Sequence, residues 1–203
     1  ATFVDKIIAL CQSPAVDIRI SAVRLLGRLP PDKLATHVTF IIAMLPICTN
    51  RGERNAILDF LRSLEPHVLS LHSNVIIDML VHRHGQTRYS AIEILGMLEP
   101  SVLATHAHII IASLEDYNAD VRMAAFNTLE KLEPYVLAPY ASRIITMIKD
   151  YPSMAYVGCI AQLQCKVANL CELLPEKLFH KHELLATGDD WIDELSAIAT
   201  HAD

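Results

Sequence analysis

Histidine is the residue whose number and spacing in this chain most suggest chemistry. The chain has ten histidines, and residues two apart on a helix point about 200° away from each other, so a His-x-His pair there cannot hold one ion. Histidines that share a repeat position sit on helices about 8–10 Å apart, whereas zinc lies about 2.0–2.1 Å from its nitrogen ligands. We therefore expect solvated or partly buried histidines and neither metal nor cofactor. The pairs are His82/His84, beside a turn at Gly85 that is the one plausible chelating geometry, His106/His108 and His180/His182.

Arginine is the second candidate, because Arg19, Arg54, Arg88 and Arg122 recur at nearly constant spacing. A guanidinium can bind a carboxylate or a phosphate through two parallel N–H donors. The column therefore predicts either structural ion pairs or a ladder for an acidic, phosphate or nucleic-acid partner. An acidic residue stands two positions before the first and the last of the four, as Asp17 and Asp120, and the net charge is −6 without a basic block. Structural pairing is favoured, and nucleic-acid binding is disfavoured because it usually needs a basic stripe.

Other signatures of catalysis or of a membrane protein are missing. The sequence has no Gly-x-Ser-x-Gly, no glycine-rich phosphate loop and no nucleophile with an obvious partner. Its five cysteines are an odd count without Cys-x-x-Cys, which favours an intracellular, reducing compartment, cytoplasmic or organellar. The longest apolar run, residues 38–48, is broken by Pro46 and is too short to span a bilayer. We expect a protein that is not an enzyme, has no small-molecule substrate and does not cross a membrane.

The helices that position these residues can be predicted from a short proline-containing motif, called the phrase below, that occurs five times along the chain. Positions eight, five and two residues before each phrase proline are apolar, which is the spacing of one helical stripe. A helix of about 13 residues therefore ends at each phrase, and the proline opens a second helix, such as 100–114, which a turn at 115–120 closes with Asp120 as the next cap. No segment alternates with period two, so the chain is expected to be all-α. The phrase prolines are Pro31, Pro66, Pro100, Pro134 and Pro175, at intervals of 35, 34, 34 and 41 residues.

Residues 120–125, Asp-Val-Arg-Met-Ala-Ala, followed by Leu129 and Leu132, resemble the second helix of a HEAT repeat. Residues 17–22 match nearly as well, and the fifth copy matches poorly because Leu163 replaces the arginine. Together with the period, the resemblance implies a right-handed α-solenoid of about five to six stacked HEAT-like antiparallel helix pairs. It also implies that the arginines pair with acidic groups of the neighbouring unit. We expect an array over 1–185, with an incomplete first unit, and a C-terminal turn and capping or docking helix over 186–203.

The expected function follows from the side of each long helix that faces away from the apolar stripe and is therefore exposed. Aromatic and methionine side chains ringed by polar groups are typical of an interface core. We therefore expect a non-catalytic protein–protein interaction scaffold, or a structural subunit of a larger assembly with protein partners. The alternatives are a HEAT-like enzyme or lyase accessory of the metal-hydroxylase or bilin-lyase type, and a phosphate or nucleic-acid binder acting through the arginine column. The candidate partner-binding residues are Tyr89, Glu93, Met97, Met123 and Asn127.

Overall fold

The computed structural model describes residues 3–30, 34, 37–141 and 143–144. The predicted all-α class is confirmed, because the described residues form α-helices and short 3-10 helices without a strand. None of these helices has the length and apolar character needed to cross a bilayer. The fifth copy of the phrase and the predicted C-terminal segment 186–203 lie outside the described residues.

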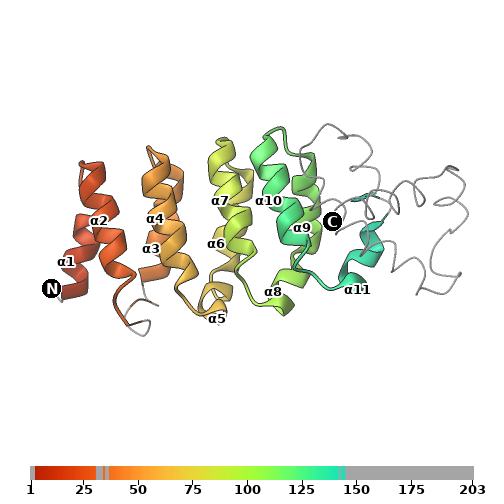
Figure 1. The fold of residues 1–203 in the computed structure, drawn as a ribbon, viewed down its shortest axis with the longest axis horizontal. Coiled ribbons are helices and arrows are strands. Elements are labelled where there is room, and N and C mark those ends of the chain that lie inside the picture. Colours follow the sequence, from red (N-terminus) through yellow and green to blue (C-terminus); the bar gives the residue numbers. More distant parts are fainter. Residues whose placement is uncertain (1–2, 31–33, 35–36, 142, 145–203) are drawn as a thin grey trace, which may run out of the picture.

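Four long helices make up the main row of the fold. Each ends just before the repeated phrase, as predicted, and they stand side by side along the longest axis (Figure 1). Contacts join each of them to the next along the chain. These helices are α2 (Val16–Leu26), α4 (Arg51–Arg62), α7 (Gly85–Leu95) and α10 (Ala119–Leu129).

The predicted apolar stripe is the core of this array. The residues eight and five positions before the first four phrase prolines are all buried, and those two positions before are buried except for Leu29, which is half-buried. Isoleucines from shorter helices pack against the stripe from α3 (Val38–Ala43), α6 (Ser73–Asp78) and α9 (Ala107–Ala112). The residues eight positions before the proline are Val23, Leu58, Ile92 and Phe126, and those five positions before it are Leu26, Leu61, Leu95 and Leu129.

The second helix is not continuous in the units that begin at Pro66 and Pro100, and in this respect the prediction is wrong. The predicted helix 100–114 is divided into α8 (Pro100–Thr105) and α9, with His106 between them at φ −103° and ψ 7°. The His106 N–H bonds to the carbonyl of Leu103, three residues back, which interrupts the α-helical ladder. Equivalent conformations occur at His72 and His37. The shared histidine position thus marks a bend, which lets the proline-initiated helices run in a different direction from the helices that follow (Figure 1).

The remaining elements are short and complete each unit. A 3-10 turn follows each of α3, α6 and α9 and leads into the next long helix. The proline-initiated helices place proline in the first turn, where its missing N–H has no helical partner to lose. These elements are α1 (Phe3–Leu10), η3 (Leu45–Ile47), α5 (Pro66–Ser70), η4 (Met79–Val81), η5 (Ser113–Glu115), α11 (Pro134–Leu137) and η6 (Ala138–Tyr140).

The start of α10 is fixed by Asn118 and not by the predicted cap Asp120. The Asn118 side chain accepts hydrogen bonds from the backbone N–H groups of Asp120 and Val121, at 2.8 and 3.4 Å. Asn118 also packs tightly against Gly85, the first residue of α7. The cap of one long helix therefore lies directly against the start of the preceding one.

Replacing Gly85 with alanine is expected to lower the free energy of unfolding by about 1 kcal/mol, the typical value of a helix N-cap. A Cβ atom there would lie 2.4 Å from Asn118 Nδ2 and 2.9 Å from its Cγ, so the capping side chain would have to move. Gly52 near the start of α4 is a matched control, because its Cβ would meet nothing closer than 3.5 Å. Urea denaturation should show Gly52→Ala neutral or stabilising, since alanine favours helix. Equal effects of the two substitutions would contradict the prediction.

Candidate functional site

The arginine column closes the turn in front of each long helix. Three of the four arginines donate from Nη1 to backbone carbonyl groups five or six residues earlier in the chain. These carbonyl groups belong to the turn before the helix that carries the arginine, so the guanidinium holds that turn against its own helix. The bonds run from Arg19 to Ser13 and Pro14, from Arg88 to His82 and Arg83, and from Arg122 to Asp116, at 2.7–3.2 Å.

Two of the arginines also form ion pairs with the next unit. Arg19 on α2 binds Glu53 on α4 through two bonds of 2.5 and 3.0 Å. Arg88 on α7 binds Asp116, just before α10, through two bonds of 2.6 and 2.8 Å, and its guanidinium carbon lies 4.4 Å from the centre of the Tyr117 ring. The acidic residues that the sequence suggested, Asp17 and Asp120, are not these partners.

Both pairs are largely shielded from solvent, and this strengthens their electrostatic effect. The hydrogen bond from Arg19 holds the pKa of Glu53 below its usual value. Burial alone would raise the pKa of Asp116, but the hydrogen bonds from Arg88 and from the backbone N–H of Asn118 outweigh it and lower that pKa. The Asp116 bond in turn raises the pKa of Arg88. All four side chains are therefore charged at neutral pH, and the pairs join consecutive units.

Arg54 on α4 does not follow this pattern. Its Nε atom is buried without a hydrogen-bond partner within the described part of the chain. The next unit explains the difference, because its residues at the repeat positions of Glu53 and Asp116 are Thr87 and His82. Neither of them carries a carboxylate. Arg54 is thus a guanidinium at a pairing position whose acidic partner is absent from the described residues.

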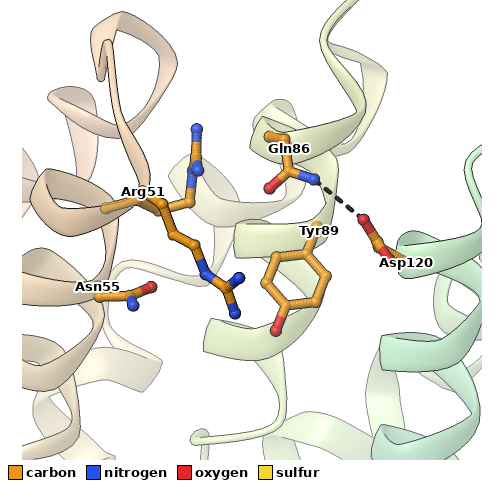
Figure 2. A pocket seen from close by; sticks show the side chains of 6 residues that line it. Arg51, Asn55, Gln86, Tyr89 and Asp120 are labelled. Atoms are coloured by element: carbon orange, nitrogen blue, oxygen red, sulfur yellow. Dashed lines mark hydrogen bonds between the residues drawn. The ribbon is translucent and has the colours of Figure 1, made fainter.

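A pocket of about 430 Å³ opens between α4 and α7 beside this arginine. Figure 2 shows Arg51 and Asn55 reaching from α4, Gln86 and Tyr89 standing on α7, and Asp120 on α10. Gln86 Nε2 donates to Asp120 Oδ2 at 3.1 Å, so the Asp120 carboxylate already accepts a hydrogen bond from within the pocket. The full lining is Arg51, Arg54, Asn55, Gln86, Tyr89 and Asp120.

Of the five predicted partner-binding residues, Tyr89 lines this pocket. Tyr89 is half-buried in the pocket, where burial, with Glu93 adding to the effect, raises the pKa of its hydroxyl. Glu93 lies outside the lining and accepts a 3.0 Å hydrogen bond from Arg62 on α4. Met97 is half-buried against the core, and Met123 and Asn127 are half-buried on α10.

Several pocket residues were not selected from the sequence. Asn55 shares the repeat position of Tyr89, eleven residues before the phrase proline, so the column already pointed to it. Arg51, Gln86 and Asp120 lie in the first turns of α4, α7 and α10, one turn before that column. These residues could have been found from the sequence as polar residues three or four positions before the column, because that spacing places them on the same helix face.

The two described cysteines are shielded from solvent, and the His82/His84 pair is joined by a local hydrogen bond. Burial raises the pKa of Cys11 to about 11 and, with Glu53 adding to it, that of Cys48 to about 12, so both thiols stay protonated at neutral pH. His82 Nδ1 accepts the backbone N–H of His84 at 3.2 Å. No group of three metal-ligating side chains comes together among the residues that the structure describes. The cysteines at 159, 165 and 171 and the histidine pair at 180 and 182 lie outside them.

Comparison with known proteins gives a likeness in fold alone. No family model and no curated protein matches the chain. The crystal structure of an engineered protein, solved by the Northeast Structural Genomics Consortium, is similar with a TM-score of 0.58 and 12% sequence identity. The match covers 100% of this chain and 95% of the engineered one.

Proposed function

We propose that this chain is a HEAT-like α-solenoid that acts as a non-catalytic protein-binding scaffold or as a structural subunit of a larger assembly. The repeat period, the row of long helices and the ion pairs between consecutive units support this reading. We propose an array over 1–185 followed by a C-terminal capping or docking segment over 186–203. The free thiols of Cys11 and Cys48 are compatible with the reducing, intracellular setting that we expect.

One observation carries the proposal. The residue eleven positions before the phrase proline is half-buried or exposed in each of the four long helices, and it recurs at a nearly constant interval along the chain. Asn55 and Tyr89 at this position line the pocket between α4 and α7, whereas Ile20 and Met123 extend the row on either side. A rigid row of aromatic, aliphatic and amide groups suits recognition of a protein surface by shape and hydrogen bonding.

The alternative functions have less support in the described residues. A phosphate or nucleic-acid binder acting through the arginine column would need its guanidinium groups available. Arg19 and Arg88 are engaged by Glu53 and Asp116, and their charges are compensated within the fold. An enzyme or lyase accessory would need a reactive group, and the two described thiols are held protonated by burial.

The test is gentle native purification with gel filtration, followed by mass spectrometry of the co-eluting proteins. We expect a complex larger than the chain, with a protein partner at constant stoichiometry. Tyr89→Ala should release that partner, because an aromatic ring at an interface contributes much of the binding energy. The circular dichroism spectrum should be unchanged, because the ring is only half-buried and is not part of the fully buried core. Tyr135→Ala, at a tyrosine 72% exposed on α11, is the matched control and should retain it. Elution of the wild-type chain alone would contradict the scaffold proposal.

A further inference from the structure

Arg54 is half-buried, and its guanidinium Nε is buried without a hydrogen-bond partner among the described residues. A buried N–H donor of a charged group normally has a partner, because its desolvation is otherwise costly. Arg54 lacks both kinds of contact seen elsewhere in the column: within the described residues its side chain makes neither a bond to the preceding turn nor an ion pair with the next unit. It lines the pocket between α4 and α7.

The other arginines show what a guanidinium at this position binds. Arg19 and Arg88 each hold a carboxylate of the following unit through two bonds. The planar carboxylate matches the planar fork of the guanidinium, and the match recurs although the two acids come from different positions in the unit. A ligand carboxylate at Arg54 would make the interaction that Thr87 and His82 do not provide.

The rest of the lining fits an anionic group. Arg51 adds a second positive charge, so the lining holds two arginines against the single carboxylate of Asp120. That carboxylate already accepts from Gln86 and lies on α10, at the far side of the pocket in Figure 2. Burial raises the pKa of Tyr89, so its hydroxyl remains a donor at neutral pH, and the Asn55 amide offers another. The local charge is thus positive on a chain whose net charge is −6.

We propose that the pocket between α4 and α7 binds a carboxylate from an acidic segment of a protein partner, with Arg54 as its principal ligand and Arg51 as a second positive charge. This inference rests on the proposed scaffold function and names the chemistry of its partner. A cavity of about 430 Å³ admits an acidic side chain together with part of its backbone. The compensated arginines of the column, Arg19 and Arg88, are not expected to take part.

The test uses the full chain and a fluorescein-labelled hexaglutamate peptide, with binding followed by fluorescence anisotropy at low ionic strength. Wild-type protein should bind the peptide, and Arg54→Ala should weaken binding about tenfold or more, as for loss of a charged hydrogen bond. Arg24→Ala removes the same charge from an exposed site on α2 and should change affinity less than about twofold, by loss of long-range attraction alone. Equal losses in the two variants would overturn the site.

A gain-of-partner variant provides a second test. His82 stands at the repeat position of Asp116, and each of these side chains accepts the backbone N–H two residues later, at 3.2 and 2.8 Å. His82→Asp should keep that turn and supply Arg54 with an internal carboxylate. We expect it to abolish peptide binding, because Arg54 would then be paired within the fold. Undiminished binding by a folded His82→Asp protein would count against Arg54 as the ligand.

Two further results separate the possible failures. Tighter binding of a phosphoserine peptide than of hexaglutamate, lost in Arg54→Ala, would overturn the assignment to a carboxylate. If hexaglutamate does not bind while the Tyr89-dependent partner still co-elutes, the carboxylate site fails and the scaffold function stands. If the peptide binds through Arg54 and the chain elutes alone from native material, the site stands and the scaffold proposal fails.

Discussion

Replacing Arg88 with alanine is expected to lower the free energy of unfolding by about 3–5 kcal/mol, the usual cost of breaking a buried ion pair by removing one partner. The Arg88 and Asp116 side chains are 7% and 11% exposed. The substitution would leave the Asp116 carboxylate desolvated, release the carbonyl groups of His82 and Arg83, and remove the contact with Tyr117. Urea denaturation followed by circular dichroism measures the loss.

Arg62→Ala is the control for this prediction. Arg62 also bonds two carboxylates, Asp59 and Glu93, but its side chain is 46% exposed. Water replaces much of what such a pair provides, so we expect a loss of about 1 kcal/mol or less. Comparable losses for Arg62→Ala and Arg88→Ala would show that the shielded pair does not link the units as we describe.

The pH dependence of the Arg88→Ala effect has a definite sign. The folded-state pKa of Asp116 is lowered, so the stabilisation from this group is fully present above the ordinary carboxyl pKa. It is lost as the pH falls toward the folded-state value and the carboxylate takes up a proton. The stability difference between wild type and Arg88→Ala should therefore be constant near neutral pH and shrink in acid. A difference that grew with acidity would contradict the pairing.

Periodicity predicted the long helices well because burial at one position per turn is a local property. The residues eight and five positions before the first four phrase prolines are all buried, and the long helices end just before the phrase begins. The bend at His106 was not predicted, because the apolar pattern continues across it from Val102 to Ile110. The bend is a change in the backbone dihedral angles of one residue, φ −103° and ψ 7° at His106, and apolar spacing does not record it.

The candidate site was harder to predict because it depends on relations between units. The arginine column is visible in the sequence, but the choice of Glu53 and Asp116 over Asp17 and Asp120 is made by side-chain reach across two helices. Arg54 differs from the other arginines because Thr87 and His82, which carry no carboxylate, occupy the repeat positions of Glu53 and Asp116. This difference can be recognised only after the structure has identified Glu53 and Asp116 as the partners. Tyr89 was identified from its column, but the hydrogen bond from Arg62 to Glu93 joins α4 to α7 and is not visible in the pattern of either helix.

Leu129→Ala tests the core on which this arrangement depends, with an expected loss of about 2–5 kcal/mol. Leu129 is the last residue of α10 and is 0% exposed, and α10 packs against α7, α9 and η5. Helices held on several sides cannot close the space that the lost side chain leaves, so the cavity adds to the lost transfer free energy. Leu25→Ala on α2, at a leucine 43% exposed, should cost about 1 kcal/mol or less. A loss below about 1 kcal/mol for Leu129→Ala would mean that the repeated stripe does not form the core, and the outward direction assigned to Tyr89 and Asn55 would lose its basis.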